Sequence, residues 1–187
     1  MASRKYQRGL TLIELMVTVV ILLVGLLGLA GMQSRLQQSE VESYQRAQAL
    51  LLLNDMSNRI MANRANAVDY VTTSATGAGN TCPAAGNTRR SQDMAEWCAA
   101  LQGAAEVIDG NRVGALIGGR GCIEQLQGDT YMVTVAWQGL LPLTPPPASV
   151  SCGANAFNDT GACSDDRCRR AVTTIVRIAS LGGQPPP

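Results

Sequence analysis

The stretch that decides the fold reads GLTLIELMVTVVILLVGLLGLAGM and covers residues 9–32. It follows a polar, basic opening, MASRKYQR, in residues 1–8. A helix from residue 10 to residue 31 would be about 33 Å long, which matches a hydrocarbon core of about 30 Å. The sequence therefore predicts a single membrane-spanning helix with the basic leader on the cytoplasmic side.

The position of the small residue distinguishes this segment from an ordinary secretory signal. Such signals carry their small-residue cleavage site after the apolar core, whereas Gly9 precedes it here. Cleavage would fall before the span. The mature protein would then keep the helix as its own amino terminus.

Glu14 is a carboxylate inside the apolar run, where an unpaired charge costs on the order of 3 kcal/mol. One interpretation pairs it with an α-amino group freed by cleavage after Gly9, on the same chain or on a neighbour. The other places Glu14 at headgroup level with its carboxylate turned to water. Position alone leaves both open.

The run Gly9-Leu10-Thr11-Leu12-Ile13-Glu14-Leu15 resembles the prepilin motif, with a leader glycine, a hydrophobic residue after the cut and a glutamate at the fifth mature position. The resemblance implies cleavage after Gly9 and N-methylation of Leu10 by a prepilin peptidase. It also implies that Glu14 pairs with a terminal amine during filament assembly. Leu10 stands where most members carry phenylalanine.

Residues 22–33 and 46–64 extend the likeness and resemble PilV-type minor pilins, also called type IV pilus modification proteins. The likeness covers residues 9–64, about a third of the chain. Gly25, Gly28 and Gly31 lie three apart, so we interpret them as helix packing or local flexibility rather than a Gly-x-x-x-Gly dimer motif.

Charge and composition exclude several classes of function. Removal of residues 1–9 would leave 12 basic against 14 acidic residues, so no charge argument favours nucleic acid. Histidine is absent, which excludes imidazole metal sites and histidine-based nucleophile pairs. Residues 118–121, Gly-Gly-Arg-Gly, have neither the lysine nor the spacing of a phosphate loop. We expect no enzyme and no cofactor or metal.

The six cysteines all follow residue 80, on the side predicted to leave the cytoplasm, and we interpret them as disulfides rather than metal ligands. They are Cys82, Cys98, Cys122, Cys152, Cys163 and Cys168. Six cysteines allow 15 connectivities. Cys82 with Cys98 is the first expectation, because they flank one loop and a short helix; the other four stay open.

The predicted fold is the α+β type IV pilin fold, with a long amino-terminal helix, a small antiparallel sheet and a disulfide-rich carboxy-terminal region. We divide the chain into a leader (1–9), a membrane half of the helix (10–32), a periplasmic half (33–64) and a globular head (65–187). In the periplasmic half we expect one apolar side to cover the sheet and Asp55 to pair with Arg59 on the solvated surface. That apolar side comprises Met32, Leu36, Ala47, Leu50, Leu51 and Met61.

Within the head, the composition of residues 65–87 predicts a loop, and residues 91–108 predict a short helix. Period-two alternation predicts two strands, one through Tyr131, Val133, Val135 and Trp137 and one through Val172, Thr174, Val176 and Ile178. Residues 121–127 supply a third strand before a turn at Gly128-Asp129. Prolines exclude a central strand in residues 140–150.

The function expected from the resemblance is that of a minor pilin that primes pilus assembly and stays in or near the tip, supporting adhesion and twitching motility. Expected partners are prepilin peptidase, other minor pilins, the major pilin, a tip adhesin and the inner membrane. The protein would begin as a single-pass inner-membrane protein with a periplasmic head and end in the pilus. Alternatives are a type II secretion pseudopilin and a DNA-uptake pilin. For the latter, Arg89-Arg90 or Arg169-Arg170 would bind the ligand, against the plainer interpretation of solvated arginines or partners of Asp165 or Asp166.

Overall fold

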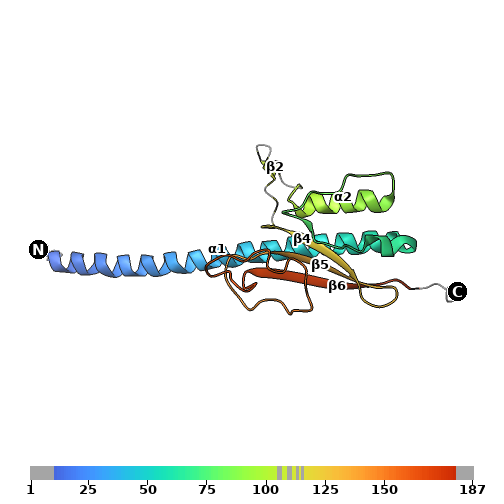
Figure 1. Cartoon of the computed structure of the whole chain (residues 1–187). Helices are drawn as coiled ribbons and strands as arrows, with labels where there is room; N and C mark the ends of the chain where they lie inside the picture. Colours follow the sequence, from blue (N-terminus) through green and yellow to red (C-terminus); the bar gives the residue numbers. More distant parts are fainter. Residues whose placement is uncertain (1–10, 105–106, 109–110, 113, 115, 180–187) are drawn as a thin grey trace, which may run out of the picture. The chain divides into compact units, whose positions relative to one another are not determined.

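The structure is a computed structural model that describes residues 11–104, 107–108, 111–112, 114 and 116–179. It is an α+β pilin fold with a long amino-terminal helix, a four-stranded antiparallel sheet and three disulfides. Figure 1 shows the long helix and the strands that follow it in the chain. The chain divides into two units, Met1–Val41 and Glu42–Pro187. Each unit is described by itself.

Helix α1 runs over Leu12–Ala62 and contributes to both units. No proline interrupts it, and Arg59 in its last turn is favourable at the negative end of the helix dipole. In the first unit, each described residue from 11 to 41 is exposed. This helix is the one described element long and apolar enough to cross a membrane.

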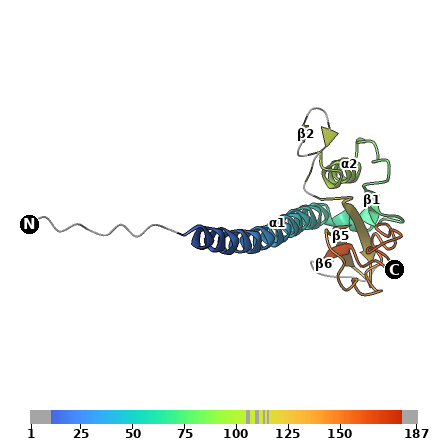
Figure 2. The same cartoon turned by 90° about the vertical axis from the view of Figure 1, so that its left-hand side faces the viewer.

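The second unit holds the rest of α1 and all remaining elements. In chain order these are the 3₁₀-helix η1 (Arg64–Tyr70), β1 (Thr76–Gly77), α2 (Arg89–Leu101), β2 (Val107–Ile108), β3 (Asn111–Arg112), β4 (Arg120–Gln125), β5 (Thr130–Gln138) and β6 (Arg169–Arg177). The main sheet has the order β1-β4-β5-β6, and β2 pairs with β3 separately. In both views α2 and β6 lie on opposite sides of this part of α1 (Figures 1 and 2).

The core of this unit forms where α1 and α2 meet the sheet. The alternating residues Tyr131, Val133, Val135 and Trp137 are all buried in it, as the period-two pattern predicts. Trp97 of α2 donates its indole N–H to the Leu52 carbonyl of α1 at 3.0 Å. Its ring lies against β4 at Gly121, where an added Cβ would come within 2.2 Å of the ring. Glycine at this position therefore lets α2 approach the strand closely.

The side of α1 that covers the sheet differs from the predicted one. The buried residues are Gln45, Ala49, Leu53, Met56, Ser57 and Ile60, whereas Leu50, Leu51 and Met61 are exposed. The leucine run in residues 50–53 places apolar side chains all around the helix, so periodicity there does not select a face. Small residues such as Ala49 and Ser57 let the helix pack closely, and the prediction gave them no weight.

Among the shorter elements, the predicted strands were confirmed, whereas the predicted helix and loop had the wrong extent. All three predicted strands are confirmed as β4, β5 and β6, Gly128 forms the turn with φ +52°, and residues 140–150 contain no strand. The predicted helix over residues 91–108 was too long. Helix α2 ends at Leu101, followed by Gly103 in a left-handed conformation, and residues 107–108 are a strand. The predicted loop over residues 65–87 contains η1 and β1.

Candidate functional site

The first turn of α1 carries the residues that the sequence marked for assembly. The helix begins at Leu12, and Thr11 caps it by accepting the backbone N–H of Glu14 on its Oγ1 at 3.4 Å. Glu14 lies in the first turn, where the helix dipole favours a negative charge. Thr11-x-x-Glu14 has the spacing of a capping box, a signal in the sequence that could have located the start of the helix. Gly9 and Leu10 lie outside the described residues.

Glu14 stands alone as a charged residue in this part of the helix. It is the single ionisable residue between positions 11 and 34, and its carboxylate has no hydrogen-bond or ion-pair partner among the residues that the structure describes. Thr18, by contrast, donates its hydroxyl to the Leu15 carbonyl at 2.8 Å. Any partner for the Glu14 carboxylate must therefore come from outside the described part of this chain.

The glycines of the span are not packed closely against any other described segment. A Cβ added at Gly25, Gly28 or Gly31 would meet nothing within 4 Å. Within the described part of the chain, their lack of side chains therefore brings no other segment closer, and close approach would need a neighbouring helix.

A charged cluster holds α1, η1 and α2 together in the second unit. Arg59 contacts Asp55 at 2.9 Å, Asp93 at 2.9 Å and Glu96 at 2.6 Å. Asp93 is 1% exposed and accepts a 2.6 Å hydrogen bond from the Tyr70 hydroxyl. The predicted Asp55–Arg59 pair is present, but describing it as a solvated surface feature was wrong, because Arg59 also neutralises a buried carboxylate from another helix.

Two pKa values reflect this cluster. Burial by itself would lower the pKa of Arg59, but its hydrogen bonds to Glu96, Asp55 and Asp93 outweigh burial and raise it. Burial raises the pKa of Tyr70, and the hydrogen bond that Tyr70 donates to Asp93 raises it further. Both groups therefore keep their protons more firmly than they would in water.

The two arginine pairs are engaged within the chain. Arg89 contacts Asp93 at 3.2 Å, and Arg90 donates to the Asp69 carbonyl at 2.9 Å. Arg169 is buried and paired with Asp166 at 3.2 Å. Arg170 pairs with Glu42 at 3.1 Å, a contact that sequence reasoning missed because the partners are 128 positions apart. These interactions favour the structural interpretation of both pairs over nucleic-acid binding.

All six cysteines form disulfides. Cys82–Cys98 confirms the expected pair, and the open pairs resolve as Cys122–Cys152 and Cys163–Cys168. Cys122 and Cys152 belong to a second apolar cluster with Ala136 and Phe157.

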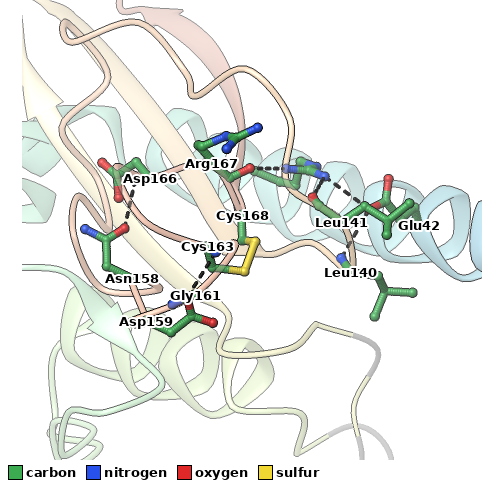
Figure 3. The surroundings of a disulfide bond; sticks show 11 residues. Glu42, Leu140, Leu141, Asn158, Asp159, Gly161, Cys163, Asp166, Arg167 and Cys168 are labelled. Carbon is green, nitrogen blue, oxygen red and sulfur yellow. Dashed lines mark hydrogen bonds and ion pairs between the residues drawn. A yellow bond between two sulfur atoms is a disulfide. The ribbon is translucent and has the colours of Figure 1, made fainter.

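The Cys163–Cys168 disulfide closes a loop directly before β6 (Figure 3). Asp159 accepts the Cys163 N–H at 3.0 Å, and Asn158 accepts the Asp166 N–H at 2.7 Å. Nearby, Glu42 accepts the Leu140 N–H at 3.1 Å. Covalent and hydrogen-bond constraints thus fix the position at which β6 begins.

Comparison with known proteins finds one family. The model of the prokaryotic N-terminal methylation motif matches residues 4–30. No curated protein and no solved structure gives a significant match. The motif, the apolar helix and the disulfide-containing α+β head together support a type IV pilin-like or pseudopilin protein, a class that is structural rather than enzymatic. The motif implies processing by prepilin peptidase and assembly with other pilins.

Proposed function

We propose that this chain is a minor pilin of a type IV pilus, cleaved after Gly9, methylated on Leu10 and incorporated in or near the pilus tip, where it primes assembly. It starts in the inner membrane with its head in the periplasm. The observation that carries the proposal is Glu14: one carboxylate in an apolar helix, with no partner among the described residues, inside a matched methylation motif.

The energetic argument follows from that carboxylate. An unpaired charge in the hydrocarbon costs on the order of 3 kcal/mol, and the helix dipole offsets a part of this. Pairing with the terminal amine of a neighbouring subunit removes most of the remaining cost, so assembly is favoured over the isolated helix. A complex of minor pilins supplies the first such neighbours and thereby nucleates the filament.

The exposed apolar side of the periplasmic half supports the same function. Leu36, Leu50, Leu51 and Met61 leave a large fraction of their side chains uncovered in the single chain. Exposed apolar side chains on one side of a helix are available for contact with another protein. In a filament, such side chains would pack against the helices of neighbouring subunits.

A type II secretion pseudopilin is the second candidate, because the methylation motif and the helix are common to both classes. The two predict different locations. A minor pilin is recovered with filaments sheared from the cell surface, whereas a pseudopilin stays with the cell envelope. Mass spectrometry of sheared filaments from cells with and without this chain therefore separates them.

The priming role predicts that deletion of this chain lowers the number of surface pili far more than the membrane pool of major pilin. Glu14→Ala should keep membrane insertion but reduce incorporation and pilus number. Glu40→Ala, which removes a carboxylate outside the apolar run, is the matched control and should leave piliation unchanged. Pilus counts by electron microscopy, beside immunoblots of membrane and sheared fractions, provide the measurement. Normal piliation after deletion would exclude priming.

A further inference from the structure

The two edges of the main sheet differ in whether other backbone segments cover them. The outer edge of β4 is covered: β1 pairs with Arg120 and Gly121, and Thr72 donates its N–H to the Ile123 carbonyl at 2.9 Å. Strand β6 lies at the other edge and pairs with β5 alone. Its outer side has no backbone partner among the residues that the structure describes.

The hydrogen-bond register identifies the free groups. Ile178 donates to the Asp129 carbonyl at 2.9 Å, and Gly139 donates to the Cys168 carbonyl at 2.7 Å. In an antiparallel ladder, hydrogen-bonded pairs recur every second residue, so the even-numbered residues of β6 bond to β5. The odd-numbered residues therefore direct their N–H and C=O groups outward. They are Ala171, Thr173, Ile175 and Arg177.

This open edge is long and accessible. Strand β6 has nine residues, contains no proline, and exposes Thr173, Ile175 and Arg177. Proteins ordinarily shorten, bend or cover such edges, because unpaired backbone groups are a template for another strand. The Cys163–Cys168 loop and the Glu42–Arg170 ion pair fix the start of β6, so the edge is held in place before any partner arrives.

We propose that the outer edge of β6 is a docking site for an extended segment of a different protein, which adds a fifth strand to the sheet and carries carboxylates at its two ends. Strand addition of this kind draws its affinity from main-chain hydrogen bonds and its specificity from alternate side chains.

The charges near the outer edge of β6 indicate which kind of strand would bind there. Arg167 and Arg177 lie exposed near the two ends of the edge, and neither guanidinium has a partner among the described residues. A second copy pairing parallel and in register would place like residues side by side, so the exposed Arg177 of one copy would lie beside that of the other. Like charges side by side are destabilising, so parallel self-pairing is disfavoured, and the two exposed guanidiniums favour a strand with acidic ends. This inference does not depend on the priming role.

The test uses the purified full-length chain in detergent micelles and a fluorescent nine-residue probe peptide of alternating valine and threonine with an aspartate at each end. Binding is measured by fluorescence anisotropy. Thr173→Pro removes one outward N–H, and we expect it to weaken binding about tenfold, whereas Thr173→Val keeps that N–H and should bind as the wild type does. Arg177→Glu should weaken binding of the acidic peptide.

Amide hydrogen exchange measured by NMR gives a readout that does not require a variant to fold. The peptide should slow exchange at Ala171, Thr173, Ile175 and Arg177 and leave the already bonded amides of Val172 and Thr174 unchanged. A peptide N-methylated on the amides that face β6 should neither bind nor slow exchange at these four amides. Equal binding by the N-methylated peptide would overturn the proposal. So would protection of the four amides in the free chain, or a homodimer that cross-links through Thr173→Cys.

Discussion

The two parts of helix α1 share one continuous backbone and differ in what stabilises them. From residue 12 to residue 41 every described side chain is exposed, and between residue 12 and Arg35 the single ionisable residue is Glu14. From residue 42 to residue 62 the helix buries six side chains against the head and forms ion pairs through Glu42, Asp55 and Arg59. The first part depends on a surrounding membrane or on neighbouring subunits, whereas the second part finds its partners within its own chain.

The largest expected effect comes from separating these parts. A chain that begins at Leu36 should stay soluble without detergent and keep a cooperative unfolding transition, because the core and all three disulfides lie beyond residue 41. Near-ultraviolet circular dichroism and thermal unfolding provide the measurement, with the full chain in detergent as the reference. An aggregated or unfolded head would show that it needs the apolar half.

The disulfides within the head should differ in their contribution according to the loop that each closes. Cys122–Cys152 joins residues 30 positions apart and Cys163–Cys168 residues 5 apart. The chain-entropy model assigns about 3.6 kcal/mol to the first loop and about 2 kcal/mol to the second. Paired cysteine-to-alanine variants, compared by urea unfolding, test this ranking. Equal losses would mean that loop closure is not the dominant effect.

The parts of the fold that could be predicted from the sequence are those with local signals. Period-two alternation located β5 and β6, because successive side chains of a strand point to opposite faces of the sheet. The Cys82–Cys98 pair was predictable because it flanks one loop and one helix. The methylation motif could be read because leader, glycine, glutamate and span coincide within one segment.

The missed features depend on contacts between distant segments. Asp93 looked like an ordinary charge on α2, and only the fold brings Arg59, Arg89 and Tyr70 around its carboxylate. The Glu42–Arg170 pair likewise joins helix α1 to the last strand of the head. The prediction of the sheet-facing side of α1 was wrong because four consecutive leucines place an apolar side chain on every face of the helix. Packing, and not periodicity, therefore decides which of them are buried.

Two of those leucines give a matched test of the corrected helix face. Leu53 is 2% exposed and Leu51 is 62% exposed. Leu53→Ala should lower the free energy of unfolding by about 3 kcal/mol through lost burial and a cavity, whereas Leu51→Ala should change it by less than about 0.5 kcal/mol. Chemical denaturation of both variants measures the difference. Similar losses at the two positions would contradict the observed packing.

The smallest expected effect is a pH dependence confined to the head. The folded-state pKa of Tyr70 is raised by burial and by its hydrogen bond to Asp93, so above about pH 10 the unfolded chain releases this proton first. The folded state then binds more protons than the unfolded state, and the free energy of unfolding falls as the pH rises further. The loss is at most about 1.4 kcal/mol for each pH unit between the two pKa values.

Tyr70→Phe should therefore flatten the stability curve above about pH 10, although it also removes the hydrogen bond to Asp93 and lowers stability at neutral pH. Burial and the charge of Asp129 raise the pKa of Tyr131 as well, so Tyr131→Phe should flatten the same window separately. Because Arg59 has a raised pKa, its ion pair with Asp93 persists across this range. Urea unfolding at stepped pH measures each slope. If Tyr70→Phe kept the full wild-type slope, the connection between η1 and α2 through Asp93 would not govern the alkaline stability of the head.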